Sequence, residues 1–171
     1  MRSMELRARI NYLLYFFIFA LFISGLTAIP LQWELGLLNR LFGQGTWLQV
    51  ILPGLSEWIT RVWQGLTDTH RSYPFMQYGT DWLAFAHFVI AIAFIWVLRD
   101  PVKNLAVIEF AIVACILVIP AAFIFGELRG IPIFWRIIDS LFGIIGIIPL
   151  WISRRYIRQL SMLLSGVPEA A

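Results

Sequence analysis

The apolar run that decides the fold extends from Gly79 to Leu98 and reads GTDWLAFAHFVIAIAFIWVL. An α-helix rises about 1.5 Å per residue, so a run of this length crosses the roughly 30 Å hydrocarbon core of a bilayer. Further runs of similar length and apolar character occupy 12–31, 102–126 and 131–152. The sequence therefore predicts an all-α, polytopic membrane protein, in which four transmembrane helices form one bundle and residues 1–171 make a single membrane domain.

Composition supports the same class and excludes others. Hydrophobic residues make up 60% of the 171 residues and charged residues only 13%, whereas soluble domains average roughly half and a quarter. The net charge of +3 does not indicate nucleic-acid binding, because the basic residues flank the spans and form no solvated basic face. The single cysteine, Cys115, lies in an apolar run and allows neither an internal disulfide nor a Cys-based metal motif. The partners we expect are the lipid bilayer and other membrane proteins or further copies of the chain.

Basic residues predict the orientation of the spans. With four spans, one group of basic residues falls on a single side: Arg2, Arg7, Arg9, Arg99, Lys103, Arg154, Arg155 and Arg158. A smaller group falls on the other side: Arg40, Arg61, Arg71 and Arg129. Because cytoplasmic loops carry the excess of Lys and Arg, both termini are expected in the cytoplasm, in what we take to be a bacterial inner membrane.

The connection between the first two spans is long and apolar. From Leu55 to Leu66, apolar residues recur at helical spacing, with Trp58 and Ile59 on the apolar face. The opposite face carries Glu57, Thr60, Arg61 and Gln64. Together with a weaker run from Trp33 to Phe42, this pattern predicts amphipathic helices within 33–67 that lie in the outer interface or over the mouth of the bundle.

The polar residues near the third span have simple expected roles. Asp100 and Pro101 are typical of a helix start, which predicts that Asp100 caps the third span. Glu109 lies near the cytoplasmic end of that span, so we expect it to pair with Arg99, Lys103 or Arg154.

Ionisable residues inside two of the spans form the candidate site. His87 on the second span and Asp139 on the fourth lie at similar depth, with Arg136 one turn from Asp139 and Asp81 near the outer end. A charge at the centre of a bilayer costs roughly 2.5–3.5 kcal/mol even on lenient scales, so such groups need a partner or a task. The pattern predicts an outward-facing polar pocket formed by Asp81, His87, Arg136 and Asp139. Gly143 and Gly146 continue the Asp139 stripe and would allow another helix to approach closely.

The pocket has two interpretations, which the residues leave open. A carboxylate that fixes an imidazole tautomer suits proton transfer or ligation of a metal or haem. Alternatively, Asp139 neutralises Arg136 within its own helix and His87 satisfies the leftover donors, in which case Asp139→Asn should be more damaging than Glu109→Gln. Haem or chlorophyll on His87 is a weaker hypothesis, since the other histidine, His70, falls in an expected polar loop. No metal site is expected, because the ligand types lack metal-binding spacing.

Three short stretches carry a resemblance. Tyr78–Trp82, Arg99–Pro101 and Arg129–Pro132 are together similar to an uncharacterised group of small four-span bacterial membrane proteins. The resemblance covers roughly the C-terminal two-thirds of the chain and implies no activity.

Three functional hypotheses follow. The first is a non-catalytic subunit or partner of a larger membrane assembly, favoured because no catalytic motif such as Gly-x-Ser-x-Gly is present. The second is a small-molecule binding or transport protein that uses the polar pocket. The third is a membrane enzyme that uses the same pocket for acid–base chemistry, or a haem- or pigment-binding subunit. Catalytic residues cannot be named.

Overall fold

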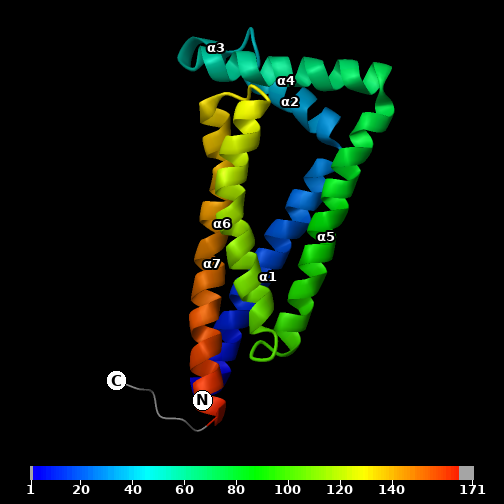
Figure 1. Ribbon diagram of the computed structural model, residues 1–171. Coiled ribbons are helices and arrows are strands. Elements are labelled where there is room, and N and C mark those ends of the chain that lie inside the picture. The colour runs from blue at the N-terminus through cyan, green and yellow to red at the C-terminus, as the bar shows by residue number, and fades with distance from the viewer. Residues whose placement is uncertain (1, 166–171) are drawn as a thin grey trace. The chain divides into compact units, whose positions relative to one another are not determined.

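The computed structural model describes residues 2–165, and every regular element in this part of the chain is helical (Figure 1). The elements are α1 (Arg2–Ala28), α2 (Leu31–Phe42), α3 (Trp47–Ile51), α4 (Pro53–Ser72), the 3-10 helix η1 (Pro74–Gln77), α5 (Tyr78–Arg99), α6 (Leu105–Leu128) and α7 (Ile133–Ser165). Among them, α1, α5 with the preceding η1, α6 and α7 are long and apolar enough to cross a membrane. The predicted all-α class with four such helices is confirmed.

Several helices extend beyond the apolar runs. α1 includes the basic N-terminal residues and ends at Ala28, two residues before Pro30, whose ring disfavours helical backbone in the residue that precedes it. α7 continues through Pro149 and the arginine cluster to Ser165. His70 was expected in a polar loop, but it lies in α4, and the residues that follow α4 form η1.

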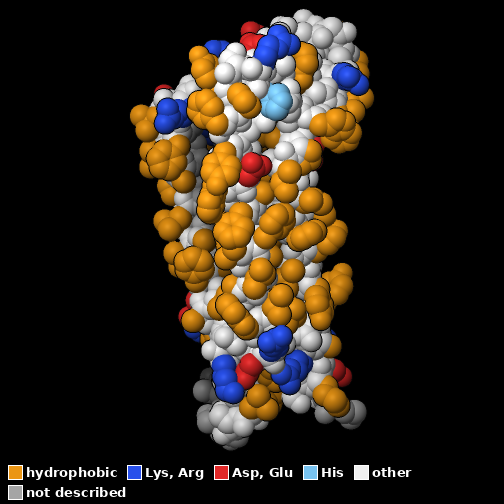
Figure 2. All heavy atoms as spheres, turned by 90° about the vertical axis from the view of Figure 1, so that its right-hand side faces the viewer, with side chains coloured by type: hydrophobic (Ala, Val, Ile, Leu, Met, Phe, Trp, Pro, Cys, Tyr) orange, Lys and Arg blue, Asp and Glu red, His pale blue; other side chains and the backbone are white. Residues whose placement is uncertain are grey.

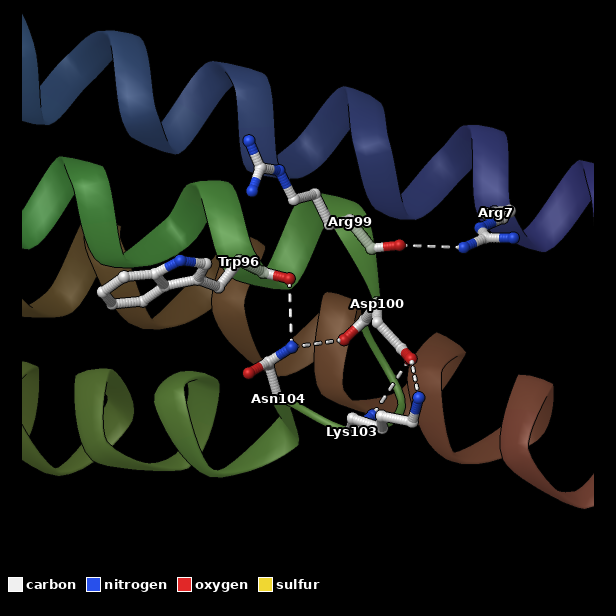
Figure 3. A network of polar contacts seen from close by, with 6 residues as sticks. All are labelled: Arg7, Trp96, Arg99, Asp100, Lys103 and Asn104. Carbon is white, nitrogen blue, oxygen red and sulfur yellow. Dashed lines mark hydrogen bonds and ion pairs between the residues drawn. The ribbon is translucent and has the colours of Figure 1, made fainter.

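The turn between α5 and α6 differs from its prediction (Figure 3). α6 begins at Leu105, after a turn over residues 101–104. Asn104 donates its side-chain amide to the carbonyl oxygens of Trp96, at 3.0 Å, and of Asp100, at 2.9 Å. The prediction that Asp100 caps α6 is therefore wrong, because its side chain lies within the turn and does not reach the first turn of the helix.

Asp100 instead binds Lys103 within the turn (Figure 3). Its Oδ1 accepts the backbone N–H of Lys103 at 3.2 Å, and the ammonium of Lys103 lies 3.1 Å from Oδ2. The backbone hydrogen bond, followed by the hydrogen bond from the ammonium, lowers the pKa of the Asp100 carboxyl below its ordinary value.

The chain forms two compact units, and each helix pair is described within its own unit. The α6–α7 unit comprises the described residues among Met1–Ala20 and Ile90–Ala171. The α2–α4 unit comprises Leu21–Val89 and so includes the end of α1 and the start of α5.

In the α6–α7 unit, α6 and α7 lie side by side and run antiparallel (Figure 1). A Cβ added at Gly143 would overlap the backbone carbonyl oxygen of Cys115 on α6, and one at Gly146 would lie 3.0 Å from the Cys115 Sγ. The predicted close approach of another helix at these glycines is confirmed.

In the α2–α4 unit, α2 packs against α4 around a buried threonine. The hydroxyl of Thr60 donates to Asn39 Oδ1 at 2.7 Å and accepts the backbone N–H of Gln44 at 2.8 Å. Thr60 is only 8% exposed, so its predicted place on the polar face of α4 is wrong. Glu57 and Arg61 are exposed as expected.

The buried positions of α4 agree only partly with the prediction. Ile59 is buried, whereas Trp58 is partly buried. Large hydrophobic side chains also remain exposed over most of the described chain, and Figure 2 shows one face on which they far outnumber charged side chains. An apolar surface of this extent is typical of lipid contact.

Candidate functional site

Asp81 and His87 both lie on α5, in the α2–α4 unit. Asp81 is exposed in the first turn of the helix, where the helix dipole favours a carboxylate. His87 Nδ1 lies 2.7 Å from the carbonyl oxygen of Leu83, one turn earlier. Because a carbonyl only accepts, Nδ1 carries the hydrogen, and Nε2 is the ring nitrogen left for another partner.

The end of α1 packs against the same part of α5 at Gly25. A Cβ added at Gly25 would lie 3.0 Å from the His87 Cβ and 2.8 Å from the Phe88 ring. The helix backbones therefore approach closely at His87, which places the base of its side chain against protein, as expected for an intramembrane imidazole.

Arg136 lies near the start of α7 and binds the preceding turn. Its guanidinium forms an ion pair with Glu127, and its Nε donates to the carbonyl oxygen of Ile131 at 2.6 Å. The absent side chain of Gly126 makes room for the arginine, since a Cβ there would lie 2.7 Å from Arg136 Cγ. With its side chain only 12% exposed, Arg136 holds the end of α6 to the start of α7.

The ion pair expected between Arg136 and Asp139 is thus replaced by the one with Glu127. Sequence reasoning missed Glu127 because it lies outside the apolar run, nine residues before the arginine. The available signal was the glycine at position 126 beside an acidic residue, at the turn that precedes Arg136.

Asp139 lies in an open groove between α6 and α7. The groove has a volume of about 330 Å³ and is otherwise mostly apolar. Its lining residues are Val118, Ala121, Ala122, Phe125, Gly126, Arg129, Ile131 and Asp139. Among residues 2–165, no hydrogen bond or ion pair joins the Asp139 carboxylate to another side chain, Arg129 included. The groove therefore contains a carboxylate that the described chain does not satisfy.

Glu109 has partners where Asp139 has none. Its Oε1 lies 2.9 Å from Arg154 Nε and 3.1 Å from Arg158 Nη2, both on α7. The predicted pairing of Glu109 with Arg154 is confirmed, and Arg158 joins it. The expectation that Asp139→Asn is the more damaging change loses its basis, because Arg136 does not depend on Asp139.

The four predicted pocket residues thus fall into two groups. Asp81 and His87 belong to the α2–α4 unit, whereas Arg136 and Asp139 belong to the α6–α7 unit. A pocket shared by the four residues stays a prediction, as does a haem or pigment on His87. Within residues 2–165, no three or more His, Cys, Asp or Glu residues gather as a metal site would require.

Comparison with known proteins adds no family to this description. The chain matches no protein-family model, no curated protein and no solved structure.

Proposed function

We propose that the chain is a non-catalytic subunit of a larger membrane assembly, and that the groove beside Asp139 binds one transmembrane helix of a different protein. The single observation that carries this proposal is a carboxylate without a partner, lying in an apolar groove of two candidate spans. A charged or polar group in such a place is costly until a hydrogen-bond donor reaches it.

The shape of the groove suits a helix. Ala121 and Ala122 line the groove on α6, with Val118 one turn before Ala122. Small side chains such as these alanines let a second helix backbone come close, which is how transmembrane helices associate without a hydrophobic driving force. A partner helix with its own small residues would therefore bury the groove efficiently.

The charges in the groove indicate the chemistry of the partner. Asp139 contributes an acceptor and Arg129 a cation, so a further Lys or Arg would be repelled by Arg129. A neutral donor, from Ser, Thr, Asn or Gln, fits Asp139 better. A second copy of this chain fits poorly, because two-fold pairing through the groove would bring two Asp139 carboxylates into one interface.

The test is co-purification from native membranes in a mild detergent. Ala122→Leu fills the groove, and Asp139→Leu removes the acceptor, so both variants should lose a partner that the wild type retains. Ala106→Leu, at an exposed position on α6, is the matched control and should retain it. Loss in the control as well, or the same partner in all four proteins, would contradict the proposal.

The same proposal places the α2–α4 segment in the outer interface of a bacterial inner membrane, with both termini cytoplasmic. The support is that Trp47, Val50 and Ile51 lie outside the candidate spans yet are 59%, 86% and 64% exposed. α2 also begins at Leu31, soon after α1 ends, which keeps these residues near the membrane. Aromatic and aliphatic side chains favour that zone.

Two measurements test this placement. Cysteines at Ser3, Ser72 and Ser161 in a Cys115→Ala background should label from outside only at position 72. Brominated lipids should quench the fluorescence of Trp47, so a fully water-exposed Trp47 would contradict the interfacial placement.

A further inference from the structure

A second cavity lies wholly within the α2–α4 unit, where α1 passes into α2. Its volume is about 240 Å³. The side chains that matter for its chemistry are Gln32, Trp33, Leu66, His70, Gln77 and Thr80. In the part of the chain that the structure describes, no Lys, Arg, Asp or Glu lines the cavity. The cavity thus combines an apolar wall with amide, hydroxyl and imidazole groups.

His70 and Gln77 form a hydrogen-bonded pair in the lining of this cavity. His70 Nδ1 lies 2.8 Å from Gln77 Oε1. If Nδ1 of a neutral ring donates, the two N–H groups of the Gln77 amide remain as donors and the His70 Nε2 lone pair remains as an acceptor. If the amide has the opposite orientation, its oxygen and the His70 Nε2–H take the same two roles in reverse. Either way, the pair offers at least one donor and one acceptor.

Such a pair fits a ligand group that also donates and accepts, such as a hydroxyl or an amide. Thr80 supports the arrangement, because its hydroxyl donates to the Gln77 carbonyl oxygen at 2.7 Å and fixes that segment. An ionic headgroup fits less well, since no side chain of opposite formal charge lines the cavity to offset its desolvation.

The size and place of the cavity suggest an amphiphile. Pockets for whole drug-sized ligands measure about 300–1,000 Å³, so this smaller cavity suits a headgroup whose tail lies elsewhere. Residues that directly follow α1 line it, and so does Thr80 in the first turn of α5. Since both helices are candidate spans, a molecule dissolved in the bilayer can reach it.

We propose that this cavity binds the hydroxyl- or amide-bearing headgroup of an uncharged, single-tailed amphiphile, with monoacylglycerol as the simplest example. A free polyol has the same headgroup chemistry but lacks the tail. The experiment therefore separates these two sources, and it is independent of the groove beside Asp139.

The test uses the full chain in nanodiscs of phosphatidylcholine and tritiated monooleoylglycerol, with binding followed by a scintillation proximity assay. Saturable binding is expected, with oleate at pH 8 competing weakly because its headgroup is charged. Free glycerol should not compete. Competition by oleate as strong as that by unlabelled monooleoylglycerol would overturn the choice of an uncharged headgroup, and displacement by glycerol would overturn the choice of an amphiphile.

Variants locate the binding. Gln77→Met keeps the length of the side chain and removes its hydrogen bonds, so affinity should fall about tenfold, the worth of one good hydrogen bond. His70→Phe should give a similar loss, so that the result does not depend on the folding of one variant. Gln64→Met, at an exposed position of α4 outside the cavity, is the control. Unchanged affinity in both folded cavity variants, or an equal loss in the control, would overturn the proposal.

Discussion

The close contact of α6 with α7 gives a quantitative prediction for Gly143→Ala. The added Cβ would overlap the carbonyl oxygen of Cys115. This oxygen is a backbone atom and cannot rotate away, so the two helices must separate. Overpacking of this kind costs about 1–3 kcal/mol, while alanine gains about 0.8–1.0 kcal/mol over glycine as a helix former.

Two other glycines separate the cost of overpacking from the gain in helix propensity. Gly65 lies inside α4, and a Cβ there would meet nothing within 4 Å. Gly65→Ala therefore reports the helix-propensity gain alone, and Gly143→Ala should be less stable than it by about 1–3 kcal/mol. Gly146→Ala, in the same helix as Gly143, should fall between them, because the Cβ would meet the movable Cys115 Sγ at 3.0 Å.

The assay is unfolding in mixed micelles, followed by far-UV circular dichroism as the fraction of dodecyl sulfate rises. The order of stability should be Gly65→Ala, then Gly146→Ala, then Gly143→Ala. Equal stabilisation by Gly143→Ala and Gly65→Ala would refute the close approach of the two helices at Gly143.

Three further tests probe separate parts of the structure. Thr60→Val should lower the stability of the α2–α4 unit by about 1–3 kcal/mol, because the two hydrogen bonds of a buried hydroxyl are lost. In the same melting assay Thr69→Val should change little, because it removes only a hydrogen bond within its own helix. Glu109→Gln should lower the melting temperature more than Asp139→Asn does, since only Glu109 has arginine partners; a larger loss for Asp139→Asn would count against the assigned pairs. Asp100→Asn should slightly lower the melting temperature at pH 7, and this effect should disappear as the pH falls through the lowered pKa of Asp100. The reason is that a carboxyl whose pKa is depressed in the folded protein stabilises the fold only when it is ionised. A pH-independent difference would contradict this role.

The long helices could be predicted because their signal is local. An apolar run long enough to cross a bilayer determines each span by itself, and the spacing from Leu55 to Leu66 indicates the helix that the structure extends to Pro53–Ser72. The pairing of Glu109 with Arg154 could also be predicted, because both lie near the same end of neighbouring spans.

The contacts of Thr60 and Arg136 could not be predicted, for a common reason. Helical spacing assigns a residue to a face of the helix but does not say which element packs on that face. The packing of α2 against Thr60 could therefore not be predicted. The spacing of three residues on one helix made Asp139 the expected partner of Arg136. The turn before α7 brings Glu127 to the arginine instead, and turn geometry is poorly determined by apolar patterning.

The central claim, that a helix of another protein occupies the groove beside Asp139, is tested most directly by photocrosslinking in native membranes. A benzoylphenylalanine would be placed in turn at Val118, Ala122 and Phe125, which line the groove, and at Ile116 and Ile124, which do not. The account predicts crosslinks from the first three positions only, to a transmembrane segment that carries small residues and a hydroxyl or amide side chain. These crosslinks should disappear with Asp139→Leu. Crosslinks to lipid alone, to a second copy of the chain, or equally from all five positions would contradict the claim.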